Sequence, residues 1–101
     1  MNTQLTGTFR QSERIVARQI AGQWLLIPLQ PTGADLQKVY LLNEPSAAIW
    51  RLLERPLTFP ELVTELGAEF AAPDEVIETD AGEFVQDLVH RGFVSQERGR
   101  E

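Results

Sequence analysis

The stretch Lys38-Val-Tyr-Leu-Leu-Asn-Glu-Pro-Ser-Ala-Ala-Ile-Trp50 divides the chain into two parts of different periodicity. Residues 39–42 form a short apolar run of strand-favouring residues. The following Asn43-Glu44-Pro45-Ser46 ends that strand, because proline cannot donate a hydrogen bond to a neighbouring strand but is tolerated in the first turn of a helix. The asparagine and serine of this segment can accept hydrogen bonds from the free amides of that turn. The sequence therefore predicts strands before this corner and helices after it.

The composition is that of one small globular domain. The 101 residues are 43% apolar and include no cysteine. This excludes disulfides, thiol catalysis and cysteine metal sites, and it fits a reducing cytosol. Residues 1–12 lack the apolar segment of a signal peptide, and the longest apolar run is too short to span a membrane. We therefore expect a cytoplasmic protein that has no membrane partner.

Charge is distributed unevenly along the chain, whose net charge is −6. Residues 1–60 carry six Lys or Arg against four Asp or Glu, whereas residues 61–101 carry three against eleven. Residues 61–87 include nine acidic residues and no Lys or Arg. Since a helix that reads DNA lies between phosphates, this part of the chain would be repelled by nucleic acid. A winged-helix DNA-binding protein is therefore a distant alternative.

Three strands are expected before the corner. Residues 14–20 and 23–29 form two of them, joined at Ala21-Gly22, where the glycine can take a positive φ. Residues 37–42 form the third strand, which would lie at the edge of an antiparallel meander. This strand is apolar on both faces, which indicates contacts on both faces.

Three helices are expected after the corner. The first covers residues 45–54, and the second follows Thr58-Phe59-Pro60-Glu61, which matches a capping box. The third and longest covers residues 74–91, with an apolar stripe at helical spacing. Gly92 suits the left-handed position that ends a helix, and Phe93 can fold back onto it.

The fold class that follows is α+β and winged-helix-like, with a three-stranded antiparallel sheet followed by three helices. We expect the domain to cover residues 14–95. Residues 1–13 would form a flexible N-terminal tail, and residues 96–101 a charged C-terminal tail.

Residues for catalysis or metal binding are scarce. The chain has a single histidine, His90, and no glycine-rich phosphate loop. The acidic residues of the third helix alternate with its apolar stripe, which is typical of a solvated helix face. We therefore expect no enzyme activity, no cofactor and no metal.

The third strand offers another use, because an edge strand exposes unpaired amides and carbonyls. If the third helix packs beside this strand, an extended peptide can add between them as a fourth strand. Its apolar side chains would enter pockets lined by Val39, Leu41, Val85 and Leu88. The alternative is that these residues are ordinary core and that the helix covers the edge completely. The pattern alone leaves both interpretations open.

An ordered set of motifs resembles the PqqD family. Val39-Tyr40-Leu41-Leu42-Asn43-Glu44 followed by Ala48-Ile49-Trp50 is similar to the family's aromatic-x-Leu-Asn corner and Ile-Trp helix. Leu57-Thr58-x-x-Glu61-Leu62 is similar to its second helix. Asp80-x-x-x-Phe84-x-x-x-Leu88 with Gly92-Phe93-Val94 resembles its third helix and end. The resemblance covers residues 14–94.

This resemblance implies a peptide chaperone, also called a RiPP recognition element, without catalysis of its own. Such proteins bind the leader of a ribosomally made precursor peptide between the third strand and third helix and deliver it to a modifying enzyme, often a radical SAM protein. PqqD itself acts this way in pyrroloquinoline quinone synthesis. The present chain departs from the family at Arg55-Pro56, where Asp-Gly is common, and in a longer loop at residues 30–37. These departures favour a PqqD-like chaperone of another peptide pathway.

The predicted peptide-binding residues come from two elements. The third strand would supply main-chain pairing, and the third helix an apolar wall: Val39, Tyr40, Leu41, Leu42, Phe84, Val85 and Leu88. The acidic helix would favour a leader with basic residues beside its hydrophobic anchors. The expected partners are the precursor peptide and the modifying enzyme, with the chain a monomer or a strand-mediated dimer. A small adaptor that grips only a partner protein is a further alternative.

Overall fold

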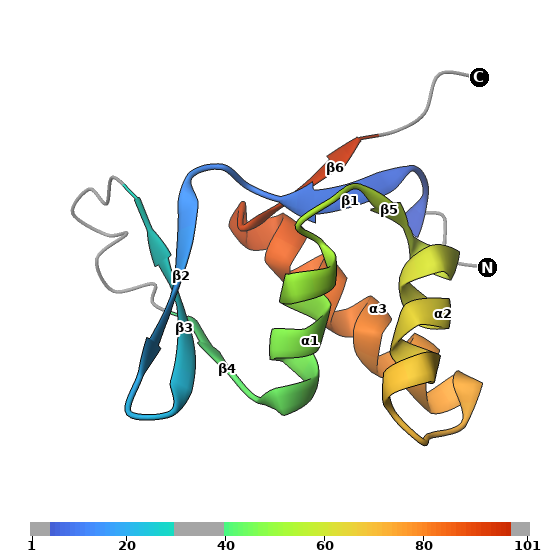
Figure 1. Cartoon of the computed structure of the whole chain (residues 1–101). Helices are drawn as coiled ribbons and strands as arrows, with labels where there is room; N and C mark the ends of the chain where they lie inside the picture. The colour runs from blue at the N-terminus through green and yellow to red at the C-terminus, as the bar shows by residue number, and fades with distance from the viewer. Residues whose placement is uncertain (1–4, 30–39, 98–101) are drawn as a thin grey trace.

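The structure, a computed structural model, describes residues 5–29 and 40–97. Two small sheets and three helices make up the described part (Figure 1). In chain order the elements are β1 (Thr8–Gln11), β2 (Ile15–Ile20), β3 (Gln23–Pro28), β4 (Tyr40–Leu42), α1 (Glu44–Leu52), β5 (Leu57–Thr58), α2 (Phe59–Glu69), α3 (Asp74–Arg91) and β6 (Val94–Glu97).

The sheet β2-β3-β4 is the predicted antiparallel meander. β2 and β3 are joined by a tight turn in which Ala21 and Gly22 have φ angles of 53° and 81°. Positive φ at both central residues is the type I′ geometry, whose twist matches that of the paired strands. β4 then pairs with β3, with Tyr40 opposite Leu26. The predicted start of this strand, residues 37–39, lies outside the described residues.

The corner and the helix ends follow the local sequence signals. Asn43 caps α1: its side chain accepts from the Ser46 amide at 3.0 Å, and the Ser46 hydroxyl accepts from the Asn43 amide at 2.9 Å. Thr58 caps α2 through the predicted capping box with Glu61. α3 has the predicted bounds, and Gly92 after it has a φ of 82°. The predicted fold class, three antiparallel strands followed by three helices, is confirmed.

The second sheet, ordered β5-β1-β6, was not predicted. β1 lies at its centre and pairs antiparallel with both neighbours, and the Phe9 side chain is buried. The expectation of a flexible tail is therefore wrong for residues 8–11, because long-range pairing orders them. β6 likewise continues through residues 96–97, which were expected to belong to the C-terminal tail.

The core lies where the three helices meet the two sheets. Leu26, Leu53, Leu62, Val85 and Leu88 have no exposed surface. The last residue of β1 joins its sheet to the end of α1: the Gln11 amide donates to the Leu53 carbonyl at 2.8 Å, and its side chain donates to the Trp50 carbonyl at 2.7 Å. Within the described ranges, no helix is long and apolar enough to cross a membrane.

Candidate functional site

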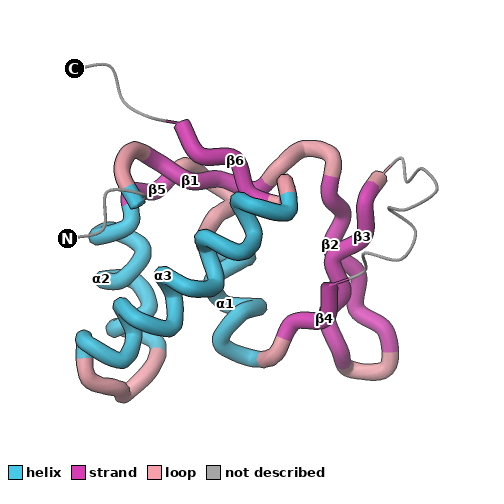
Figure 2. Tube along the Cα trace, turned by 180° about the vertical axis from the view of Figure 1, so that it is seen from behind, coloured by secondary structure: helices cyan, strands magenta, loops and turns pink. Residues whose placement is uncertain are grey.

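β4 is an edge strand of its sheet. β3 pairs with it on one side, and among the described residues no backbone hydrogen bond reaches it from the other side. Seen from behind, α3 crosses in front of α1, and the sheet stands beside both (Figure 2). Alternate backbone groups of β4 point away from β3 and are available to a further strand.

Tyr40 connects this edge to α3. Its hydroxyl donates to Asp87 Oδ2 at 3.2 Å. Its ring meets the Phe84 ring edge to face, with centroids 5.9 Å apart, and the Arg91 guanidinium lies 5.1 Å from its centroid. Arg91 Nε also donates to Asp87 Oδ2 at 3.1 Å. A network that combines hydrogen bonds, ring contact and cation–π contact fixes the position of α3 relative to β4.

Two influences keep the Tyr40 hydroxyl protonated. Burial raises the pKa of Tyr40, and the hydrogen bond and negative charge of Asp87 raise that pKa further, while Arg91 opposes them. A neutral phenol can donate a hydrogen bond and a phenolate cannot. The link between β4 and α3 therefore persists through neutral and moderately alkaline pH. We call the surface made by Tyr40, Leu41, Leu42, Phe84, Asp87 and Arg91 the β4–α3 site.

The predicted strand residues take three different places. Tyr40 is half-buried against Phe84, which is itself half-buried. Leu41 points to the opposite face of the sheet and is 54% exposed, whereas Leu42 is buried in the core. Val39 lies outside the described residues. The structure thus brings two of the predicted peptide-binding residues, Tyr40 and Phe84, into contact.

The predicted helix wall needs a correction. Val85 and Leu88 have no exposed surface, because they point from α3 into the core. They pack beneath the surface of α3 and are not accessible to a peptide bound at that surface. Phe84 and Asp87 face β4 instead, since both contact Tyr40.

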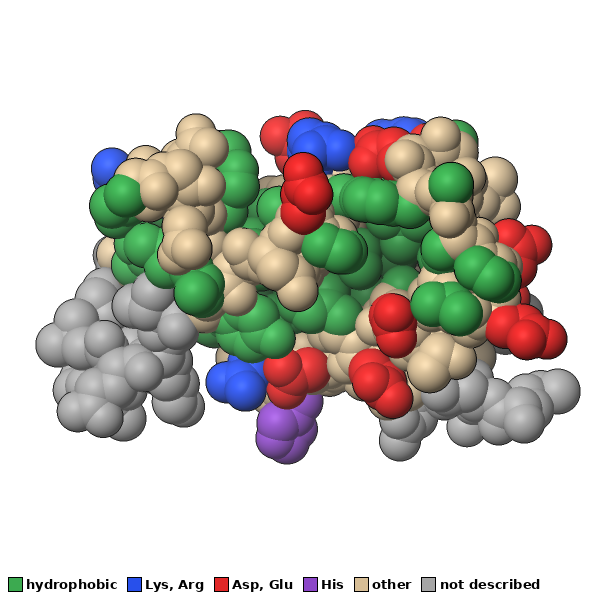
Figure 3. Space-filling view, turned by 90° about the horizontal axis from the view of Figure 1, so that it is seen from below, with side chains coloured by type: hydrophobic (Ala, Val, Ile, Leu, Met, Phe, Trp, Pro, Cys, Tyr) green, Lys and Arg blue, Asp and Glu red, His purple; other side chains and the backbone are tan. Residues whose placement is uncertain are grey.

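A separate apolar pocket of about 160 Å³ opens where the helices begin and end. It lies between the first turn of α1, the end of α2 and the first turns of α3, and we call it the helix-end pocket. Its lining residues are Pro45, Ile49, Leu66, Phe70, Ala72, Val76, Ile77, Asp80 and Ala81. Val76 is 47% exposed at its rim. Figure 3, seen from below, shows hydrophobic side chains gathered on this face with Asp and Glu around them.

Sequence reasoning missed this pocket. Val76 and Phe70 stand on different elements, and only the tertiary packing brings them together. The sequence contained one indication of it. Val76 is apolar but lies outside the buried stripe of α3, so the packing of that stripe does not explain an apolar residue at this position.

In the described part of the chain, the arginines near these surfaces are in ion pairs, whereas most acidic side chains of α3 are not. Arg51, Arg55 and Arg91 are each in an ion pair, with Glu69, Glu65 and Asp87 respectively. Asp80 is the one charged residue that lines the helix-end pocket. No ion pair within the described residues involves the acidic side chains of α3 other than Asp87. The unpaired charge along α3 is therefore negative, whereas at the β4–α3 site Arg91 offsets Asp87.

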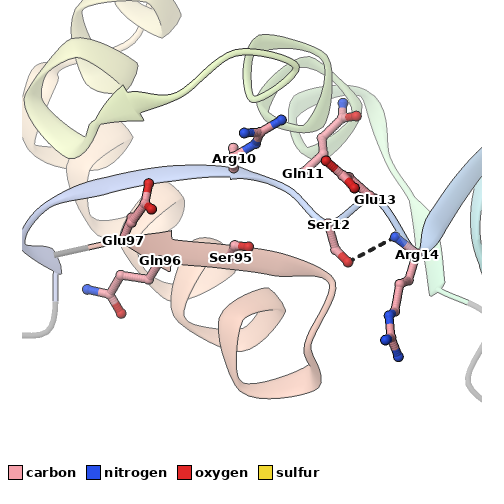
Figure 4. Close-up of a pocket in the computed structure, with 8 residues that line it drawn as sticks. All are labelled: Arg10, Gln11, Ser12, Glu13, Arg14, Ser95, Gln96 and Glu97. Carbon is pink, nitrogen blue, oxygen red and sulfur yellow. Dashed lines mark hydrogen bonds between the residues drawn. The ribbon is translucent and has the colours of Figure 1, made fainter.

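No catalytic constellation is visible in the described ranges. No group of His, Cys, Asp and Glu there could hold a metal ion. A polar pocket of about 460 Å³ borders β1, β6 and the turn between β1 and β2. In Figure 4 the charged groups of Arg10 and Arg14 point to opposite sides of the chain, so they do not converge on one ligand.

The family model described as coenzyme PQQ synthesis protein D (PqqD) matches residues 25–94, well over half of the chain. The chain belongs to the PqqD family. The match spans β4, all three helices and the first residue of β6, so it includes every element of the β4–α3 site. The expected family resemblance is confirmed.

A solved structure has a similar fold. The chain is similar to a structure entitled "TbiB1 in Complex with the TbiA(beta) Leader Peptide", with a TM-score of 0.70 and 22% identity over 89% of this chain and 99% of that chain. At this identity the likeness shows a shared fold. No curated protein matches the chain. The winged-helix likeness stays a prediction.

Proposed function

We propose that this PqqD-family protein binds the leader region of a ribosomally synthesised precursor peptide at the β4–α3 site and performs no catalysis of its own. The observation that carries the proposal is the free edge of β4, held beside an acidic helix by Tyr40. Family membership supports it, and so does the fold shared with TbiB1, whose structure holds a leader peptide.

The bound leader would pair through its main chain with β4, as in other strand-addition complexes. Its side chains on one face would contact Tyr40 and Phe84. A neighbouring apolar side chain would enter the helix-end pocket, whose volume of about 160 Å³ suits one leucine or aromatic ring. Asp80 at the rim would favour a basic residue next to that anchor.

The complex would then present the rest of the precursor to a modifying enzyme, such as a radical SAM protein, in the cytoplasm where the precursor is made. Binding the leader alone leaves the part to be modified free. A carrier of this kind needs a modest affinity, because the peptide must be released after modification.

An NMR titration with the leader peptides encoded beside the gene tests the proposal. We expect shifts concentrated at β4 and at the face of α3 that carries Phe84 and Asp87. Val76→Gln makes the rim of the helix-end pocket polar and should weaken leader binding about tenfold, equivalent to about 1.4 kcal/mol. Ile20→Gln is the matched control, since Ile20 is similarly exposed on β2 and should have no effect.

Two results would refute leader binding at this site. The first is a folded sample that shows no shifts with any neighbouring leader, which would return the function to a protein-only adaptor. The second is an equal loss of affinity in Val76→Gln and Ile20→Gln, which would place the peptide elsewhere.

A further inference from the structure

The opposite edge of the same sheet is a second open strand. β2 pairs with β3 alone, and its only other backbone hydrogen bond among the described residues runs from the Ile15 amide to Ser12. With six residues it is twice as long as the described part of β4. An edge of this length can bind a further strand.

A cleft of about 220 Å³ lies beside this edge, between the inner face of the sheet and α1. Ile15, Ala17 and Trp24 line it from the sheet, and Ala47 and Trp50 line it from α1. Trp24 is 39% exposed, which leaves part of a large aromatic side chain accessible to a partner. A strand added to β2 would direct alternate side chains into this cleft, where apolar residues fit best.

The other face of β2 carries positive charge. Side chains alternate along a strand, so Arg18 lies on the face opposite to Ile15 and Ala17. Arg14 belongs to the turn that immediately precedes β2. Both are exposed, and neither makes a side-chain hydrogen bond or ion pair with another described residue. Every described arginine of the helical part, by contrast, has a carboxylate partner. Unpaired arginines beside a free edge favour acidic residues on the incoming strand.

We infer that the β2 edge docks an extended segment of a partner protein in which acidic residues alternate with apolar ones. Its apolar side chains enter the cleft between Trp24 and Trp50, and its carboxylates meet Arg14 and Arg18. If the proposed function holds, the partner is the modifying enzyme. The two edges are separated by β3 and lie about 10 Å apart, so leader and partner can bind together.

The probe is a short synthetic peptide in which Glu alternates with Val and Leu, titrated into the labelled full-length protein. We expect NMR shifts at residues 15–20 and at the indole groups of Trp24 and Trp50. The double variant Arg14→Glu/Arg18→Glu should bind the probe at least about tenfold more weakly. Arg10→Glu is the control for charge reversal away from the edge: it reverses one arginine on β1 and should bind the probe normally, and each single variant, Arg14→Glu and Arg18→Glu, is compared with it at equal net charge.

Three outcomes would overturn the inference: shifts that map to β4, an equal loss in Arg10→Glu, or shifts at residues 15–20 that depend on protein concentration without peptide, which would show a second copy at this edge. Leader binding by the double variant separates this inference from the proposed function. A loss of probe binding with unchanged leader binding supports the β2 edge alone. Folding of both variants is checked by their NMR spectra.

Discussion

The two edges of the sheet β2-β3-β4 differ in what stands beside them. The β4 edge lies beside α3, to which Tyr40 attaches it, and the unpaired charge along that helix is negative. The β2 edge faces a cleft beside α1, and its arginines have no partner among the described residues. If both proposals hold, one small sheet would offer two strands of opposite preference, with basic peptides at one edge and acidic segments at the other.

The two proposals together would give a chain of 101 residues two binding surfaces without a large core. Strand addition uses backbone groups that every sheet edge has, so little additional structure is needed. On these proposals, the groups beside each strand, and not the strand itself, would determine what binds. The comparison of the two edges therefore depends on their surroundings: α3 lies beside β4, whereas α1 and the arginines lie beside β2.

The largest expected effect concerns the core behind the β4 edge. Leu88→Ala removes a completely buried side chain of α3 and should lower the free energy of unfolding by about 2–5 kcal/mol. Ile20→Ala, on the more exposed β2 edge, should cost far less. Urea unfolding of both variants measures the difference. Equal losses would mean that the two edges depend on the core to the same extent.

A smaller effect is expected for the link between β4 and α3. Tyr40→Phe keeps the ring and removes the hydrogen bond to Asp87, which should cost about 0.5–1.5 kcal/mol. Because the pKa of Tyr40 is raised in the folded protein, its contribution is complete below the unfolded pKa of about 10 and is lost as pH rises through the folded pKa. Stability should therefore fall above about pH 10 more steeply in the wild type than in Tyr40→Phe. Parallel pH profiles of urea unfolding would contradict the role of this hydroxyl.

The smallest effect concerns the ion pairs of the helices. Arg51 and Glu69 are 2.8 Å apart but both largely exposed, so Arg51→Ala should cost at most about 1 kcal/mol. This cost should shrink as salt is added. Arg18→Ala, which removes an unpaired arginine of β2, should leave stability unchanged within about 0.5 kcal/mol. Thermal unfolding at two salt concentrations checks both, and a clear loss in Arg18→Ala would show that this arginine has a structural partner.

The sequence predicted those parts of the fold that depend on local signals. The Asn43 cap, the Thr58 capping box and the turn at Gly92 each involve residues a few positions apart. β1 was missed because it contains one buried apolar residue, Phe9, and is ordered by pairing with β6 at the far end of the chain. No pattern within residues 8–11 reports that partner.

The site was predicted in part for a similar reason. The periodicity of α3 placed Phe84, Val85 and Leu88 on one stripe, but a stripe does not reveal which of its two sides meets other elements. Tertiary packing buries Val85 and Leu88 and leaves Phe84 beside Tyr40. Peptide contact by these residues stays a prediction until a leader is bound.

The hairpin turn of β2 and β3 has one more consequence. Ala21 has a φ of 53°, a conformation that alanine rarely adopts and that asparagine or glycine accepts more readily. The turn therefore carries a small conformational strain. An asparagine at this position should release it, and thereby offers a way to make the protein more heat-resistant while both binding edges keep their chemistry.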